Sequence, residues 1–309
     1  MSSISVKEVY KSYGKTEALR GVSMEVGDGE LFGMIGPDGA GKTSLFRIMT
    51  SLILPDKGSV LVDGFDTVEQ YEDIRKEVGY MPGRFSLYMD LTVEENLKFY
   101  ASIFGTTIEE NYHLIKDIYS HIEPYKKRRA DKLSGGMKQK LALSCALIHE
   151  PKILFLDEPT TGVDPVSRKE FWAILKNLQR SGMTIVVSTP YMDEANLCDR
   201  IALMDNGKFL MIDTPANIVA NFERKLWHTT SDDKYRLLVD LREYDGMDDC
   251  YVFGEYHHFT IKEEMQNDFD TEDLRNYLAA RNHRNIVIEP VMPTIEDTFM
   301  KLSKDNGKE

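Results

Sequence analysis

The sequence predicts an α/β fold with a largely parallel sheet and a small C-terminal α/β appendage. Two continuous apolar runs, at residues 153–156 and 184–188, are typical of strands buried on both faces of a sheet. Helical patterns at 165–180 and 191–198 alternate with these runs, which indicates a parallel sheet with helices on its faces. A shift in charge balance near residue 222 separates the appendage from the larger part of the chain.

Length and composition are those of an ordinary globular protein. The chain has 309 residues and a mass of 35.4 kDa, which favours one large domain or a large and a small one. Hydrophobic residues make up 42% and charged residues 29%, and the sequence has no low-complexity stretch and no repeat of fixed period. Disordered and repeat architectures are therefore excluded.

The negative charge is unevenly distributed. The net charge is −13; residues 222–309 hold 12 basic and 20 acidic residues (−8), against 26 and 31 (−5) in residues 1–221. We therefore expect a large domain over residues 1–221 and a small acidic domain over residues 222–309. The excess of acid argues against nucleic acid as a partner, because proteins that bind it neutralise phosphates with basic surfaces.

Membrane-spanning, secreted and zinc-binding classes are also disfavoured. No window approaches about 18 consecutive apolar residues, so no membrane span is expected, and the N-terminal residues lack the pattern of a secretory signal. Cys145, Cys198 and Cys250 are too few and too scattered for a disulfide framework or a zinc site. A reducing cytosolic setting follows.

The N-terminal half begins with predicted strands over residues 4–9 and 18–26. An apolar run over residues 30–35 then stops in a glycine-rich loop, and a helix is predicted over residues 44–51. Residues 92–149 are predicted to be mainly helical.

Two capping boxes mark helix starts in that helical region. Thr92 pairs with Glu95, and Thr107 pairs with Glu110. In the appendage we predict strands over 235–241, 250–261 and 286–291 and helices over 271–281 and 294–302. No motif in the appendage indicates a chemistry.

Residues 36–43 fit the pattern G-x-x-x-x-G-K-[ST], which cradles phosphates. Glycines let backbone N–H groups face the phosphates, and the helix that follows adds its positive N-terminal end. Lys42 would reach the β- and γ-phosphates, and the Thr43 hydroxyl would hold Mg²⁺. A chance glycine-rich turn is disfavoured, because the match lies between an apolar strand and a helix. The predicted nucleotide-binding residues are Gly36, Pro37, Asp38, Gly39, Ala40, Gly41, Lys42, Thr43 and Ser44.

Residues 153–158 form an apolar strand that ends in two carboxylates. Asp157 is expected to support Mg²⁺, and Glu158 is expected to polarise a water molecule. Alone, the pattern is also that of a solvated loop after a buried strand. The phosphate-loop pattern upstream favours the catalytic interpretation.

A third motif covers residues 133–140. Ser134, Gly135 and Gly136 open a predicted helix, and such a start can bind a second anion. Since one nucleotide needs one phosphate loop, a second anion site suggests a nucleotide held between two chains. Taken alone, a plain Ser cap followed by a flexible turn is the favoured alternative.

These three motifs, in this order and followed by residues 159–165, resemble the ATP-binding subunit of ABC transporters. The resemblance covers about residues 4–215. It implies a RecA-like core with an antiparallel β subdomain and a helical subdomain. It also implies Walker A and B motifs at 36–43 and 153–157, Glu158 as catalytic base, an LSGGM signature at Leu133–Met137, and Asp164 as the D-loop aspartate.

Tyr13, just before Gly14, resembles the aromatic residue that stacks on adenine in this family. The alternative is an ordinary core or surface tyrosine.

The family resemblance further implies ATP and Mg²⁺ as cofactors and a head-to-tail pair with a second ABC ATPase subunit, identical or different. It implies membrane permease subunits as partners, contacted through the helical subdomain and the loop around residues 83–88. The chain would then be peripheral at the cytoplasmic face of the cell membrane. Residues 80–90 and 293–297 look most like the exporter branch of the family.

Two positions depart from the family pattern. Gly83 stands where the Q-loop usually has Gln, and Pro190 stands where the H-loop usually has His. The Gln would serve Mg²⁺ and the attacking water, and the His would contact the γ-phosphate; proline has no side-chain donor. We expect ATP binding to survive and hydrolysis at this chain's own site to be slow, as in the weak half of a heterodimer. Pro190 is predicted to begin a helix capped by Thr189.

Three alternatives remain open. The chain could be a non-catalytic ATP-binding regulatory subunit, or a soluble ABC protein that acts on ribosomes or DNA. The basic run at residues 126–129 could bind phosphate or lipid, although a solvated helical edge or loop is favoured.

Overall fold

The computed structural model describes residues 2–266 and 268–306, and its contacts divide the chain into two compact units. One unit runs to Ile218 and includes the chain from Phe299 onward, and the other is Val219–Thr298. Within the described residues, no helix is both long enough and apolar enough to cross a membrane. The domain division at residue 222 stays a prediction.

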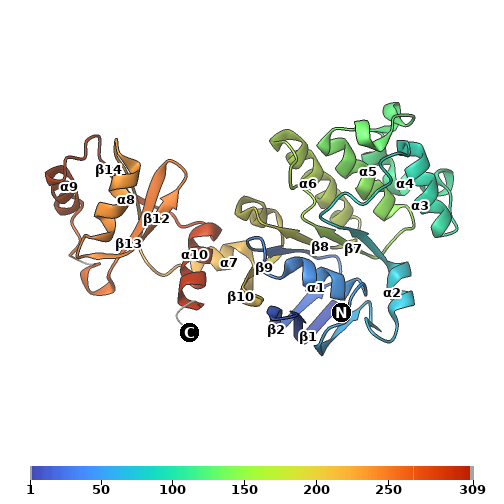
Figure 1. Cartoon of the computed structure of the whole chain (residues 1–309), viewed down its shortest axis with the longest axis horizontal. Coiled ribbons are helices and arrows are strands. Elements are labelled where there is room, and N and C mark those ends of the chain that lie inside the picture. The colour runs from blue at the N-terminus through green and yellow to red at the C-terminus, as the bar shows by residue number, and fades with distance from the viewer. Residues whose placement is uncertain (1, 267, 307–309) are drawn as a thin grey trace. The chain divides into compact units, whose positions relative to one another are not determined.

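A six-stranded sheet forms the centre of the first unit, in the order β10-β9-β3-β8-β7-β6 (Figure 1). All neighbours are parallel except the β9–β10 pair, which confirms the predicted largely parallel sheet. Strands β3, β7 and β8 therefore end at one edge of the sheet, where α/β proteins bind ligands. The strands are β3 (Leu31–Ile35), β6 (Val78–Met81), β7 (Ile153–Asp157), β8 (Thr184–Thr189), β9 (Arg200–Asp205) and β10 (Lys208–Asp213).

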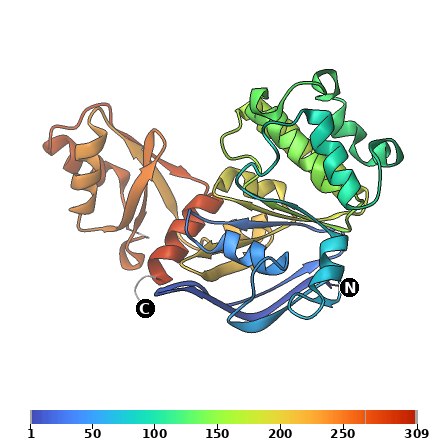
Figure 2. The same cartoon turned by 45° about the vertical axis from the view of Figure 1, so that its right-hand side comes forward.

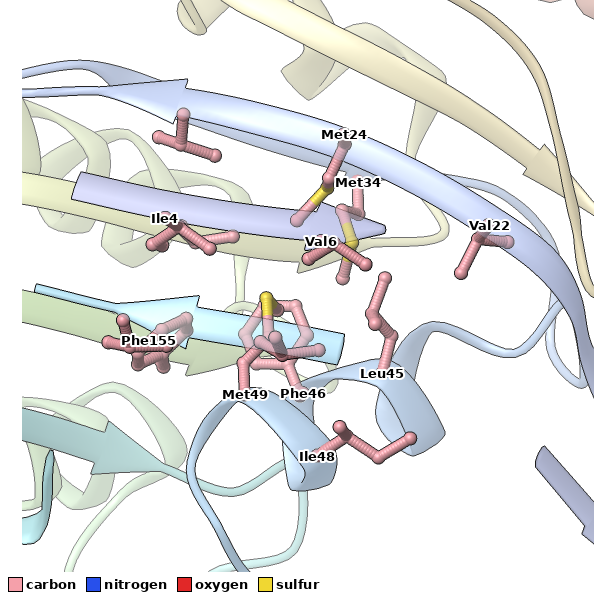
Figure 3. Packing of buried hydrophobic residues seen from close by; sticks show 14 of the residues in the cluster. Ile4, Val6, Val22, Met24, Met34, Leu45, Phe46, Ile48, Met49 and Phe155 are labelled. Carbon is pink, nitrogen blue, oxygen red and sulfur yellow. The ribbon is translucent and has the colours of Figure 1, made fainter. Parts of the chain in front are cut away.

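A second, antiparallel sheet has the order β2-β1-β4-β5. Helix α1 (Lys42–Met49) shares one hydrophobic core with both sheets (Figure 3), and the rings of Phe46 and Phe155 meet edge to face at 5.9 Å. This packing fixes the loop that precedes α1 relative to β7. The strands are β1 (Ser2–Tyr13), β2 (Thr16–Gly27), β4 (Lys57–Val62) and β5 (Phe65–Asp66).

A group of helices supplies the predicted helical subdomain. Both predicted capping boxes are confirmed, at Thr92–Glu95 and at Thr107–Glu110. Helices α3, α4 and α5 lie together and apart from α1 in both views (Figures 1 and 2). The α-helices of this unit other than α1 are α2 (Tyr71–Glu77), α3 (Val93–Ile103), α4 (Ile108–Tyr119), α5 (Gly135–Leu147), α6 (Pro165–Arg180) and α7 (Pro215–Ala220), together with the part of α10 (Ile295–Asn306) that follows Thr298.

The second unit has the order β-α-β-β-α-β, with an antiparallel sheet arranged β12-β13-β11-β14. Leucines of α8 and α9 pack with Trp227 and Phe259 on one face of this sheet. Its elements are β11 (Leu226–Thr230), α8 (Lys234–Arg242), β12 (Met247–Phe253), β13 (Tyr256–Ile261), α9 (Thr271–Ala280) and β14 (Val287–Val291), and α10 (Ile295–Asn306) follows.

Three predictions from the sequence are wrong in detail. Residues 235–241 form helix α8 instead of a strand, because Asp233 caps it and Leu237 and Leu241 share its buried side. Residues 250–261 hold parts of two strands, since Gly254 (φ +57°) lies in the turn between β12 and β13. The helix predicted over 191–198 is a short 3₁₀ helix, Met192–Leu197.

Candidate functional site

The phosphate-binding pattern at residues 36–43 lies in the loop between β3 and α1. A Cβ atom at Gly36 would lie 2.1 Å from the carbonyl oxygen of Met204, so only glycine fits there. Gly41 caps α1 with φ +110°, and a Cβ there would lie 2.5 Å from the Ala18 carbonyl oxygen. The loop is therefore pressed against β2 and the end of β9, with the N-terminus of α1 behind it.

Lys42, the first residue of α1, is 4% exposed. Its Nζ donates to the carbonyl oxygens of Gly36 (2.7 Å) and Pro37 (2.9 Å) and lies 3.4 Å from Oε1 of Glu158. The ammonium group is thus held between the loop and the carboxylate of Glu158, the predicted catalytic base. Thr43 and Ser44 are half-buried in the first turn of the same helix.

The two carboxylates follow β7 as predicted. Asp157 is buried, and one of its oxygens accepts a 2.6 Å hydrogen bond from the Ser188 hydroxyl. The backbone N–H of Glu158 donates to both Ser188 oxygens, at 3.1 Å and 3.0 Å. Burial and the nearby Asp157 raise the pKa of Tyr80 to about 12, so this phenol stays neutral. Ser188 and Tyr80 were not predicted, because their role depends on strand pairing and not on a local pattern.

A magnesium site at Thr43 and Asp157 fits the donors present. Both offer the hard oxygens that Mg²⁺ prefers. Thr43 is in α1, the helix after the phosphate loop, and Asp157 is the last residue of β7, which packs against α1.

Gly83 lies beside Asp157, and Pro190 follows β8, the strand that pairs with β7. A Cβ at Gly83 would lie 3.1 Å from the backbone oxygen of Asp157, so the chain passes close to the end of β7 here. Pro190 directly follows β8, whose Thr189 carbonyl accepts from the N–H of Gly36 at 3.3 Å. The prediction that Pro190 begins a helix capped by Thr189 is wrong, because the 3₁₀ helix starts at Met192 with Tyr191 at its N-cap position; the Thr189 hydroxyl accepts from the N–H of Tyr191 at 3.0 Å in the segment before it.

The predicted signature residues open helix α5. Ser134 caps that helix by accepting from the N–H of Met137 at 3.4 Å. A Cβ at Gly136 would lie 2.7 Å from the Ser167 hydroxyl, and one at Gly135 would lie 3.3 Å from the Gly162 carbonyl oxygen. The signature therefore packs on the turn that precedes α6.

Asp164 caps α6 and accepts from the N–H of Ser167 at 3.0 Å. That hydrogen bond holds the pKa of Asp164 below its usual value, so the carboxylate stays charged. In both views α5 lies apart from α1 (Figures 1 and 2), so the phosphate loop and the signature are on separate parts of the chain.

Tyr13 lies at the end of β1 with 46% of its surface exposed. Its hairpin partner β2 borders the phosphate loop through Ala18 and Leu19, which face Gly41. An exposed ring on this hairpin suits adenine stacking, and that role stays a prediction.

The basic run at 126–129 is a loop between two 3₁₀ turns, Glu123–Tyr125 and Ala130–Lys132. Arg129 pairs with Asp90 and with Asp131, and the Arg128 guanidinium lies 4.5 Å from the Tyr125 ring. These contacts agree with the solvated loop that was favoured.

Comparisons with known proteins match this chain to ATP-binding proteins of ABC transporters. The family model described as "ABC transporter" matches residues 19–161. The chain is 43% identical over 227 residues to the Escherichia coli (strain K12) protein named "Probable multidrug ABC transporter ATP-binding protein YbhF", and the match covers 70% of this chain and 38% of YbhF. The chain thus spans less than half the length of that relative.

Other relatives match almost end to end. Nod factor export ATP-binding protein I of Rhizobium etli is 35% identical over 307 residues, covering 98% of this chain and 94% of the relative. Among solved structures, cbiO1 from Clostridium perfringens, part of the transporter complex cbiONQ, has a TM-score of 0.64 and 27% identity over 72% of this chain and 92% of its own. The dimeric ATP-binding cassette MJ0796 bound to ADP and phosphate has a TM-score of 0.62 and 27% identity, over 68% and 98%.

Proposed function

The chain belongs to the ATP-binding proteins of ABC transporters, a family of ATPases, and we propose that it hydrolyses ATP to power export by separate permease subunits. The observation that carries the proposal is the meeting of Lys42, Asp157 and Glu158 at one edge of the sheet. In this role the chain is peripheral at the cytoplasmic face of the cell membrane. Relatives named for multidrug transport and Nod factor export support export as the direction of transport.

An apolar pocket of about 380 Å³ supports the permease as partner. It lies between the segment after β6 and helices α3 and α5, and Phe104 stacks on His149 at 3.8 Å beside it. Its lining includes Pro82, Phe85, Tyr100, Phe104, Cys145 and His149. The pocket and Gly83 share one segment of chain, and Gly83 lies next to Asp157, so a permease bound there could influence the catalytic strand.

The separation of signature and phosphate loop supports a second ATPase subunit. Ser134, Gly135 and Gly136 would complete a nucleotide site on the partner subunit. Asp164 would lie in the same interface between the two subunits. ATP with Mg²⁺ at Thr43 and Asp157 is the substrate form, in which the metal neutralises phosphate charge. Lys42 would hold the β- and γ-phosphates, and Glu158 would orient the attacking water.

We further propose that this chain is the catalytically weak half of a heterodimer. Gly83, next to Asp157, and Pro190, directly after β8, offer no side-chain donor or acceptor. Two missing groups of this kind would slow hydrolysis by about two orders of magnitude, because phosphoryl transfer depends on positioning and charge stabilisation. A non-catalytic ATP-binding subunit is the limiting case.

The test measures ATPase rates of the purified chain alone and together with a candidate partner ATPase and permease. We expect slow hydrolysis by the chain alone, ATP-dependent copurification with the permease, and a gain of at least about tenfold in the Gly83→Gln/Pro190→His variant. The Gln side chain fits if the loop moves by a few tenths of an ångström away from Asp157. Rapid hydrolysis by the chain alone, abolished by Glu158→Gln, would contradict the weak-half proposal.

A further inference from the structure

A buried glutamate, Glu194, lies behind the edge of the sheet where the catalytic residues meet. It is on the 3₁₀ helix Met192–Leu197 and is 2% exposed. A carboxylate buried to this extent needs hydrogen-bond partners, and the identity of those partners suggests its role.

Two buried threonines donate to Glu194. The Thr160 hydroxyl lies 2.8 Å and 3.1 Å from its two carboxylate oxygens, and the Thr189 hydroxyl lies 2.6 Å from one of them. Thr160 stands two residues after Glu158, and Thr189 stands directly before Pro190. One carboxylate therefore joins the segment after the catalytic base to the segment where the family's histidine is missing.

The backbone at the first of these segments needs such support. Glu158 has φ +50°, a region that costs energy for a residue other than glycine. The turn that follows is closed by a 3.2 Å hydrogen bond from the N–H of Thr161 to the Glu158 carbonyl oxygen. At the start of this turn the Glu158 N–H donates to the Ser188 hydroxyl oxygen. Within the turn the Thr160 hydroxyl donates to Glu194.

Arg168 of α6 completes the cluster. Its guanidinium lies 3.7 Å from Glu194, 3.1 Å from Asp193 and 4.6 Å from the ring of Tyr191. The buried carboxylate thus has a cationic neighbour in addition to the two threonine donors.

We propose that Glu194 is a positioning residue for ATP hydrolysis. It holds residues 158–160 and 189–191 in fixed relation, so that Glu158 faces the attacking water although Pro190 supplies no donor. This inference rests on the proposed role of Glu158 as catalytic base.

The experiment compares single-turnover hydrolysis and ATP affinity of the full chain in three variants. Glu194→Ala should lower the hydrolysis rate constant about tenfold and change the Kd for ATP less than about twofold. Glu194→Gln keeps an acceptor and should retain most of the rate. Asp193→Ala, which removes an exposed partner of Arg168, is the matched control and should match the wild type. A wild-type rate in folded Glu194→Ala, or a Gln variant as slow as the Ala variant, overturns the proposal.

Thr160→Val and Thr189→Val remove one arm of the bridge each. Each should slow hydrolysis in the wild-type chain and have no further effect in the Glu194→Ala chain. Additive losses would mean that the threonines act separately from Glu194.

A second readout separates this inference from the proposed function. If Glu158→Gln leaves hydrolysis unchanged, the proposed base is wrong, and hydrogen exchange then decides the role of Glu194. Amides of residues 160, 161, 189 and 191 should exchange faster together in Glu194→Ala and not in Asp193→Ala. Unchanged exchange at either segment overturns the bridge.

Discussion

Buried charges are arranged in opposite ways in the two units of this protein. In the nucleotide-binding unit, Lys42 contacts two backbone carbonyls and lies 3.4 Å from Glu158, whose side chain is 22% exposed. In the C-terminal unit, Asp297 is fully buried and accepts from Tyr251, His258 and Thr294, each at 2.7 Å. The first arrangement leaves charge available to a ligand, whereas the second uses its charge within the fold.

Asp240 repeats the pattern in the C-terminal unit. His283 lies 2.8 Å from it, and Arg236 and Arg281 lie at 3.6 Å and 3.5 Å. His283 in turn contacts the Ser231 hydroxyl at 3.0 Å. The buried carboxylates of the C-terminal unit are thus held by side chains and N–H groups of the fold, whereas Lys42 is held by loop carbonyls and a partly exposed carboxylate.

Among the variants that test this contrast, Asp297→Ala should have the largest effect, a loss of unfolding stability. Four donors from three residues would lose their acceptor inside the fold, so the C-terminal unit should lose about 3–5 kcal/mol of stability while ATP affinity stays unchanged. Urea unfolding followed by Trp227 fluorescence measures it, in a Trp172→Phe background where Trp227 is the remaining tryptophan.

Glu255→Ala is the control for that experiment, because its ion pair with Lys234 is exposed and should contribute little. Equal losses in both variants would show that the buried network contributes no more than a surface pair.

Lys42→Ala should have the opposite signature. Without the ammonium group, ATP affinity should fall about 100-fold, or about 2.7 kcal/mol, while unfolding stability changes by no more than about 1 kcal/mol. Titration with ATP and Mg²⁺ followed by calorimetry measures the affinity. Lys152→Ala, which removes an exposed pair with Asp63 and Glu77, is the control. A large loss of stability with unchanged affinity would place Lys42 with the structural charges.

The sequence predicts the charged residues of the nucleotide site better than it predicts the buried carboxylates that are hydrogen-bonded within the fold, and the reason is physical. Lys42, Asp157 and Glu158 stand in short patterns, because a phosphate loop and a strand end are built from consecutive residues. The partners of Glu194 come from positions 160 and 189, and His258 meets Asp297 across 39 residues, so no local pattern reveals them.

Local patterns also mislead where packing decides. Residues 235–241 have strand-like composition, yet the Asp233 cap and the burial of Leu237 and Leu241 favour a helix. Pro190 suits a helix start, but the 3₁₀ helix begins two residues later, at Met192, with Tyr191 in extended conformation before it.

Lowering the pH should destabilise the hydrogen-bonded network around Asp297, with a smaller effect than that of Asp297→Ala. Burial alone would raise the pKa of Asp297, but hydrogen bonds from His258, Thr294 and Tyr251 outweigh it and lower that pKa below its usual value. Its contribution to stability is therefore present above about pH 4 and is lost as the pH falls through the lowered pKa. Asp297→Asn, which keeps one acceptor but does not ionise, should show less of this loss when Trp227 fluorescence is followed between about pH 5 and 2. An identical pH profile would exclude Asp297 as the titrating group.

Tyr13→Ala is the smallest expected effect, and it extends the comparison to tyrosines. The Tyr251 hydroxyl is used inside the fold, whereas the Tyr13 ring is 46% exposed on the hairpin whose strand β2 borders the phosphate loop, and we expect it to stack on a base. Removing the ring should weaken ATP binding about fivefold, or about 1 kcal/mol, and Tyr13→Phe should bind as the wild type does. Tyr10→Ala on the same strand is the matched control, because its ring instead packs over Gly21. If Tyr13→Ala binds ATP as tightly as Tyr10→Ala does, Tyr13 is an ordinary surface tyrosine, and exposure beside a site does not make a side chain part of it.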